Sequence, residues 1–255
     1  IGLMATASTS YNEPYNLARY FASLDFLSNG RASWNVVTSW LEEEAANFGL
    51  EQLPRHGTRY QRASEFIDVV TRLWDSWEDG AAIFDKARGL FADADKVHHL
   101  EYQGEYFRVR GPLNVPRPPQ GHPLLVQAGS SEAGKALAAA WSDMHFVFIH
   151  SIAEGLAYRE EMNQRLRQHG RDPAHFKIIA GVLPVVVNSD EEKAARQQLN
   201  EQLMSDQMAI DLLSSYLRMD LSALPRDQPL PPLPDEESFD GIRTALKLIR
   251  QYDPR

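Results

Sequence analysis

The segment Gly129-Ser130-Ser131 combines a flexible backbone with two hydroxyl groups. It lies between a predicted strand at 124–128 and an alanine-rich predicted helix at 133–141. Backbone N–H groups at the start of a helix, together with hydroxyl side chains, form a natural binding site for a phosphate group. Serine is also a common residue at helix N-caps. The motif therefore predicts either a phosphate site or a simple helix cap.

His56 and Tyr60 are four residues apart across the predicted start of a helix. Residues at this spacing lie on the same side of a helix, so an imidazole and a phenol could face one ligand. The alternative is a surface histidine beside a tyrosine that packs at the edge of the core. The spacing alone leaves both interpretations open.

Polar side chains also gather where the first two predicted strands end. They are Thr6, Ser8, Thr9 and Ser10 after the first strand, and Asn35, Thr38 and Ser39 after the second. In parallel α/β folds such strand ends face the ligand, although serine and threonine are frequent in ordinary loops as well. Together with the segment at 129–131, these strand ends favour a binding site at one edge of a sheet.

Common metal and hydrolase motifs are missing from the sequence. His98 and His99 are adjacent in a predicted strand and would face opposite sides of it, so they are unsuited to bind one metal ion. His122 and His145 are isolated, and we expect them to be structural. The chain has no H-E-x-x-H, G-x-S-x-G, Walker or G-x-G-x-x-G motif. We therefore predict no metal site, and metallohydrolase, serine hydrolase, P-loop and Rossmann functions lack support.

The elements that would position these residues alternate between strand and helix. Strands are predicted at 1–8, 33–38, 124–128, 144–149 and 178–187. Helices are predicted from Asn12, as the cap, to Ser28, at 60–77, 133–141 and 153–168, after Asp190, and at 239–250. A hairpin is predicted at 97–109, turning at 103–104, and a proline-rich loop at 220–238. Continuous apolar strands separated by helices are typical of a parallel sheet with covered faces.

Composition narrows the class of protein. The chain has 255 residues, a net charge of -9 and no cysteine, and 43% of its residues are hydrophobic. The hydrophobic content supports a sizeable core, and the negative charge argues against a nucleic-acid partner. The lack of cysteine fits a reducing cytoplasm, and no apolar run is long enough to predict a membrane span. Because Ile1–Ala7 resembles the middle of a buried strand without leader features, we expect a partial chain.

Several segments, in order over nearly the whole chain, carry a family resemblance. They are Thr6 to Tyr15, Phe21 to Asp25, Gly30 to Ser39, Asn47 to Gly49, His56-x-x-Arg59-Tyr60, Leu73 to Trp77, Gly111 to Pro116 and Gln127 to Ser131. As a set they resemble the flavin-dependent monooxygenases of the nitrilotriacetate/dibenzothiophene-sulfone type, within the bacterial luciferase-like superfamily. No single segment is specific, but the ordered set is.

The resemblance implies a TIM (β/α)8 barrel of the luciferase-like type, of which this chain would cover only strands 3 to 7. The chain would form a single partial barrel domain over residues 1–255, with an inserted hairpin segment at 80–123. Five strands cannot close such a barrel. The resemblance therefore predicts the ancestry of the chain and leaves its activity by itself open.

The resemblance also implies an enzyme that uses reduced FMN and O2 to oxidise a small organic substrate, such as an aminopolycarboxylate or a sulfone. A separate NADH:FMN oxidoreductase would supply the reduced flavin, and a homodimer or homotetramer is expected. Carried over by position, the FMN contacts would be Thr6, Asn35, His56, Tyr60, Ser130 and Ser131. Thr6 and Asn35 would lie near the ring system, and Tyr60 and the serines near the phosphate. His56 is the candidate catalytic acid or base, because an imidazole titrates in the useful range.

Two alternatives stay open at this point. The first is a luciferase-like barrel that uses a deazaflavin for hydride transfer. The second is a truncated, inactive chain that persists as an oligomer or a binding module. The sequence does not distinguish among the substrates of the family.

Overall fold

The computed structural model describes residues 1–182, 184–203, 205–217 and 219–225. The chain divides into two compact units, residues 1–181 and residues 182–255. The predicted helix at 239–250 and most of the predicted loop at 220–238 lie outside the described residues. The assignment of residues 1–255 to a single partial barrel domain stays a prediction.

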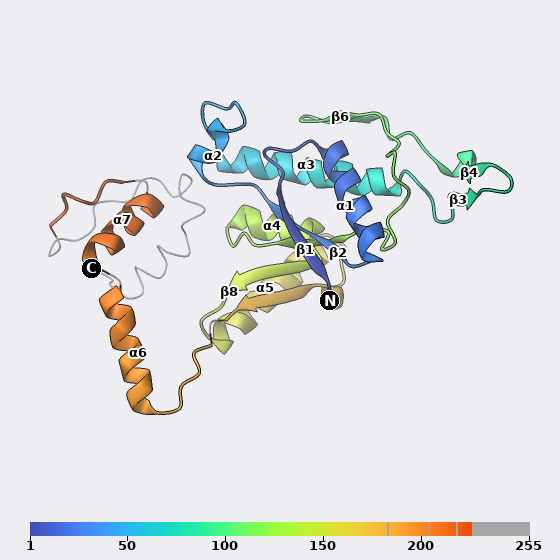
Figure 1. The fold of residues 1–255 in the computed structure, drawn as a ribbon. Helices are drawn as coiled ribbons and strands as arrows, with labels where there is room; N and C mark the ends of the chain where they lie inside the picture. The colour runs from blue at the N-terminus through green and yellow to red at the C-terminus, as the bar shows by residue number, and fades with distance from the viewer. Residues whose placement is uncertain (183, 204, 218, 226–255) are drawn as a thin grey trace. The chain divides into compact units, whose positions relative to one another are not determined.

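The first unit is built on a five-stranded parallel sheet with the strand order β1-β2-β7-β8-β9 (Figure 1). The strands are β1 (Leu3–Ser8), β2 (Ala32–Val37), β7 (Leu124–Gln127), β8 (Met144–Phe148) and β9 (Lys177–Gly181). Every neighbouring pair is parallel, which confirms the five predicted strands of the sheet. The order ends at β1 and β9, so the sheet seen in the described residues is open.

Helices pack against this sheet and against one another. They are α1 (Pro14–Ser28), α2 (Glu42–Ala46), α3 (His56–Asp75), α4 (Glu132–Trp141) and α5 (Ile152–Gln168), with a short 3₁₀ helix, η2 (Pro173–His175). α1 packs on β2 and α3, and α4 packs on β7, α3 and α5. The predicted Asn12 cap is wrong, because Glu13 precedes the helix while the Asn12 amide donates a hydrogen bond to the Ser8 carbonyl at 2.8 Å. α3 begins four residues earlier than predicted, which brings His56 into its first turn.

Strand β2 shows which face of the sheet the helices cover. Trp34 and Val36 are buried in the core formed with α1 and α3. Side chains alternate along a strand, so Asn35 lies on the opposite face. Thr6 of β1 is the register partner of Asn35 and lies on that same face. The helix-covered face therefore carries the core, and the other face carries two of the predicted site residues.

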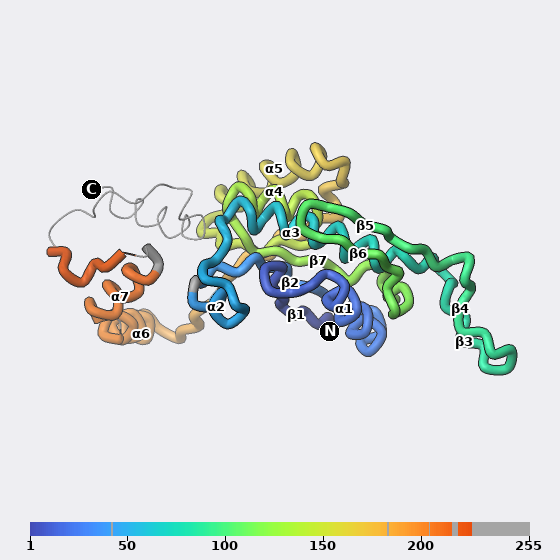
Figure 2. The backbone as a smooth tube through the Cα atoms, turned by 90° about the horizontal axis from the view of Figure 1, so that it is seen from above, coloured from blue at the N-terminus to red at the C-terminus, as the bar shows by residue number. Residues whose placement is uncertain are grey.

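The region 80–123 contains two hairpins. β5 (Tyr102–Gln103) pairs antiparallel with β6 (Arg108–Val109), which confirms the predicted hairpin with shorter strands. The turn lies at 104–107, where the Gly104 N–H donates to the Phe107 carbonyl, and not at the predicted 103–104. β3 (Ala82–Asp85) and β4 (Leu90–Ala92) form a hairpin that was not predicted, and it extends away from the sheet (Figures 1 and 2). The 3₁₀ helix η1 (Ala94–Lys96) follows it.

The predicted strand placement of His98 and His99 is wrong, since β5 begins only at Tyr102. The backbone N–H of His98 donates to the Ser76 carbonyl at the end of α3 instead of to a neighbouring strand. The two rings have separate partners. His98 Nε2 lies 2.7 Å from Glu78 Oε1, and His99 Nδ1 lies 2.9 Å from the Gly111 carbonyl oxygen.

The second unit contains α6 (Asp190–Leu203) and α7 (Asp206–Leu217). α6 confirms the helix predicted after Asp190, whereas α7 was not predicted. The predicted strand at 178–187 is wrong beyond Gly181, because β9 pairs with β8 only as far as Phe148, where β8 ends. A strand needs a hydrogen-bonded neighbour. In the part of the chain that the structure describes, no helix is long and apolar enough to cross a membrane.

Candidate functional site

The N-termini of α3 and α4 meet beyond the carboxyl end of β7. His56 is the first residue of α3, and Ser131 is the N-cap of α4. The Nε2 atom of His56 lies 3.4 Å from the Oγ atom of Ser131. The same Oγ accepts a hydrogen bond from the Gly134 N–H at 3.1 Å. The hydroxyl of Ser131 thus caps its own helix and contacts the neighbouring one.

Tyr60 lies one turn further along α3 and completes this cluster. The centroid of its ring is 4.5 Å from that of His56. A methyl group added to Gly129 would lie 2.5 Å from the Tyr60 hydroxyl and 2.5 Å from Gln127 Nε2. Only glycine leaves room for such an approach. The structure therefore brings His56, Tyr60 and the loop at 129–131 together, as the sequence predicted.

This cluster has the chemistry of an anion site. The first N–H groups of a helix lack partners within that helix, and the positive ends of two helix dipoles converge here. Ser130 is exposed beside the buried Ser131, so a hydroxyl and the backbone are accessible from outside. The Oε1 atom of Gln127 is buried without a hydrogen-bond partner in the described residues. Buried polar groups are normally satisfied, but an amide oxygen only accepts hydrogen bonds, so this atom is no partner for a phosphate.

Thr6 and Asn35 form a second group, on the face of the sheet away from the helices. The side-chain amide of Asn35 donates a hydrogen bond to Thr6 Oγ1 at 3.0 Å. Asn35 and Thr6 are register partners on neighbouring strands, whereas His56, Tyr60 and Ser131 stand on α3 and at the start of α4. The predicted site residues therefore fall into two groups, one on the strands and one at the helix N-termini.

The remaining polar residues at the strand ends bond to one another. Ser8 Oγ lies 2.8 Å from Ser39 Oγ, and Ser10 Oγ donates to the Thr38 carbonyl at 2.7 Å. Thr9 Oγ1 donates to the Val37 carbonyl at 3.3 Å. These bonds join the ends of β1 and β2, so loop capping explains these residues.

His145 and Tyr158 belong to the surroundings of the site, although sequence reasoning assigned no role there to either. His145 on β8 is fully buried, with Nε2 3.1 Å from the Gly129 carbonyl oxygen and Nδ1 2.8 Å from the Tyr158 hydroxyl. Burial lowers the pKa of His145 to about 4 and raises the pKa of Tyr158. No spacing rule links a strand residue to a helix residue thirteen positions later, so only the fold reveals the pair.

No metal centre is evident in the part of the chain that the structure describes, where no group of three or more candidate ligands gathers. The predicted isolated His122 lies 2.9 Å from Asp75 through its Nε2 atom. Its role there is a polar contact between the end of α3 and the segment before β7.

Known proteins resemble the chain throughout its length. Residues 1–237 match the family model described as luciferase-like monooxygenase. N-acetyl-S-(2-succino)cysteine monooxygenase of Bacillus subtilis is 45% identical over 100% of this chain and 58% of its own length. Nitrilotriacetate monooxygenase component A of Aminobacter aminovorans is 45% identical over 96% of this chain and 55% of its own length. The chain thus spans little more than half the length of these relatives.

A solved structure agrees with the sequence match. Riboflavin lyase, crystallised with a modified FMN and riboflavin, superposes with a TM-score of 0.82 at 33% identity, over 94% of this chain and 55% of its own. The parallel sheet with its covering helices is therefore a partial-length match to a luciferase-like α/β fold, and barrel closure is not seen in the described residues. The chain belongs to the luciferase-like monooxygenase family of flavin-dependent oxidoreductases.

Proposed function

We propose that the chain is part of an FMNH2- and O2-dependent monooxygenase that oxidises a small organic molecule. Its family and its relatives support this proposal, and the name of one relative, component A, implies a second component. A separate NADH:FMN oxidoreductase would be that component for this chain. The observation that carries the proposal is the meeting of the α3 and α4 N-termini at His56, Tyr60 and Ser131.

The cluster at the two helix N-termini suits the phosphate of FMN. Ser130, Ser131 and Tyr60 would donate hydrogen bonds to the phosphate oxygens, and both helix dipoles would stabilise its charge. Thr6 and Asn35 would lie beside the ring system. Two separate groups of contacts match a cofactor that has a charged end and a flat, polar ring at the other end.

Bound reduced FMN supplies two electrons, so that one atom of O2 enters the substrate and the other leaves as water. The role of the protein chain would be to bind the cofactor, to orient it and to keep water away from it. His56 contacts Ser131 Oγ, so in this proposal its imidazole would lie at the phosphate end. Binding is therefore the role that its geometry supports better, and proton transfer by His56 stays a prediction.

The substrate class that we propose is broad. The named relatives act on N-acetyl-S-(2-succino)cysteine and on nitrilotriacetate, and we propose a small aminopolycarboxylate, sulfone or similar molecule for this chain. A homodimer or homotetramer in a reducing cytoplasm is part of the same proposal.

Flavin titration tests the cofactor. Quenching of flavin fluorescence on addition of the chain should give a lower Kd for FMN than for riboflavin, because riboflavin lacks the phosphate. Oxygen uptake with NADH, FMN and a flavin reductase then tests the reaction with candidate substrates. Reduction of a deazaflavin without oxygen uptake would favour hydride transfer instead. No quenching by either flavin at high protein concentration contradicts the cofactor proposal.

A further inference from the structure

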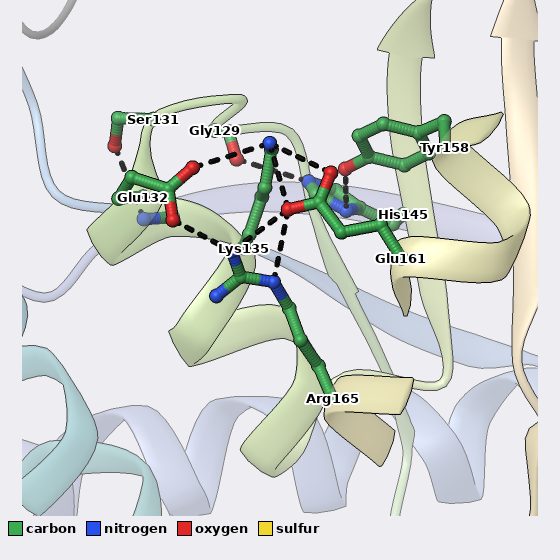
Figure 3. A network of polar contacts seen from close by, with 9 residues as sticks. Gly129, Ser131, Glu132, Lys135, His145, Tyr158, Glu161 and Arg165 are labelled. Carbon is green, nitrogen blue, oxygen red and sulfur yellow. Dashed lines mark hydrogen bonds and ion pairs between the residues drawn. The ribbon is translucent and has the colours of Figure 1, made fainter. Parts of the chain in front are cut away.

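The carbonyl group of Gly129 is held from inside the protein. His145 lies beneath the loop at 129–131, with Nε2 3.1 Å from the Gly129 oxygen, and Tyr158 of α5 lies on the other side of the imidazole at 2.8 Å from Nδ1 (Figure 3). His145 is 0% exposed. The three groups form one chain of hydrogen bonds that ends at the peptide bond between Gly129 and Ser130.

The chemistry of these partners fixes the hydrogen positions. A carbonyl oxygen can only accept, so Nε2 of His145 carries the hydrogen and donates it to Gly129. A neutral imidazole has one N–H group, so Nδ1 is the acceptor and the Tyr158 hydroxyl is the donor. The Gly129 carbonyl therefore selects the tautomer of His145, and the Tyr158 hydroxyl stabilises that tautomer by donating to Nδ1.

The direction of the Gly129 carbonyl sets the direction of the next N–H group. A trans peptide is planar, and its C=O and N–H bonds point in opposite directions. Since the carbonyl points to His145, the N–H of Ser130 points away from His145. Without His145, this glycine-containing loop could turn the same peptide around, because glycine tolerates both conformations.

We propose that His145, held by Tyr158, is the positioning residue that orients the Gly129–Ser130 peptide so that the loop before α4 binds the FMN phosphate. This inference rests on the proposed FMN site and names a residue that acts on it from behind. His145 does not touch the cofactor, so its effect should depend on the phosphate and not on the ring.

Charged residues keep the two helices of this arrangement together. Lys135 on α4 lies 2.9 Å from Glu161 on α5, and Arg165 on α5 lies 2.6 Å from Glu132 at the start of α4 (Figure 3). Glu161 also binds Arg165 at 2.7 Å. These ion pairs tie the first turns of α4 to the helix that carries Tyr158, so the tyrosine and the phosphate loop keep their spacing.

The test compares the Kd values of FMN and riboflavin in variants of the chain. His145→Leu should weaken FMN binding about tenfold, the loss expected for one buried hydrogen bond, and leave riboflavin within about twofold. His145→Gln should restore most of the FMN affinity, because its amide N–H can reach the carbonyl. Leu166→Ala, in the core beside α4, is the matched destabilising control and should leave the FMN-to-riboflavin ratio unchanged. An unchanged ratio in His145→Leu overturns the inference.

Two further measurements test the inference even if the His145→Leu variant does not fold. Tyr158→Phe removes a single hydroxyl, and it should lower FMN affinity about threefold with no change for riboflavin. Imidazole 15N NMR of the wild-type chain should show Nε2 protonated and Nδ1 unprotonated. The opposite tautomer overturns the inference. A wild-type chain that binds neither flavin, or binds both equally, contradicts the proposed phosphate site itself, while the NMR result still decides the hydrogen bond to Gly129.

Discussion

Ser131 Oγ lies 3.4 Å from His56 Nε2 while it caps α4 through the Gly134 N–H. One hydroxyl group therefore has a structural partner in its own helix and a second partner at the start of α3. If a phosphate binds here, the same atom sits at its edge. The helix cap and the phosphate site, which the sequence left as alternatives, are compatible in one residue.

Ser131→Ala separates these two roles when it is compared with Ser151→Ala. Ser151 caps α5 by accepting a hydrogen bond from the Glu154 N–H at 3.1 Å, the same distance as in α4. Each variant should lose about 1 kcal/mol of the free energy of unfolding, as N-cap serines do. Only Ser131→Ala should weaken FMN binding, by about tenfold. Urea unfolding and flavin titration measure the two effects, and equal FMN affinity in both variants would contradict the phosphate assignment.

Asn35→Ala tests the ring end of the proposed site. The variant removes the amide that donates to Thr6, and it should weaken FMN and riboflavin alike, each by about fivefold. Ser33→Ala is the control, because Ser33 lies on the same face of β2 and donates to the Leu3 carbonyl at 3.0 Å. A loss for FMN alone would place Asn35 at the phosphate instead, and a loss in Ser33→Ala would point to damage of the strand.

The sequence predicted those parts of the fold that repeat a local pattern. In α1 the apolar residues recur at helical spacing, and Asn29 and Gly30 end the helix with φ values of 56° and 74°. The length of β9 could not be predicted, because it depends on where β8 stops. The β3–β4 hairpin depends on contacts such as that of Phe84 with Phe91, whose ring centroids are 5.1 Å apart. No periodic pattern of apolar residues in the sequence predicts such contacts.

The candidate site also contains residues that the sequence predicted and one that it did not. Ser131 stands at a predicted helix start, where capping residues follow a recognisable pattern, and the family resemblance implies His56 and Tyr60 as FMN contacts. His145 could not be found, since a lone histidine in an apolar strand carries no local signal. Its role depends on which loop lies above it and which helix covers it, and only the packed structure supplies both.

Glu65 on α3 should anchor the β5–β6 hairpin. Its carboxylate accepts hydrogen bonds of 2.9 to 3.1 Å from the backbone N–H groups of Glu105, Tyr106 and Phe107. Glu65→Ala leaves these donors without their acceptor and should cost about 1–3 kcal/mol of unfolding free energy. Arg110→Ala, which removes only the exposed pair with Glu101, should cost under about 0.5 kcal/mol. Similar urea midpoints for the two variants would show that the carboxylate does not hold the hairpin.

The folded chain should lose stability as the pH is lowered, because of His145. Its pKa is about 4 in the folded chain against an ordinary value of 6.5, mainly because the ring is buried. The hydrogen bond with Gly129 opposes this shift, and the positive charge of Lys135 adds to it. Between these values the unfolded chain binds a proton that the folded chain does not. Stability is therefore lost as pH falls from about 6.5 to about 4, by up to about 3 kcal/mol, and this residue adds nothing further below that.

His145→Gln isolates this contribution, because glutamine keeps a donor for Gly129 and does not titrate. The wild-type and variant free energies of unfolding, measured with urea across the same pH range, should run parallel above about pH 6.5. Below that the wild-type value should fall away from that of the variant until about pH 4. Tyr158, the group nearest to Nδ1, has a raised pKa and keeps its proton throughout. Parallel curves over the whole range would mean that the pKa of His145 is the same in the folded and unfolded chains, which its burial against Gly129 and Tyr158 opposes.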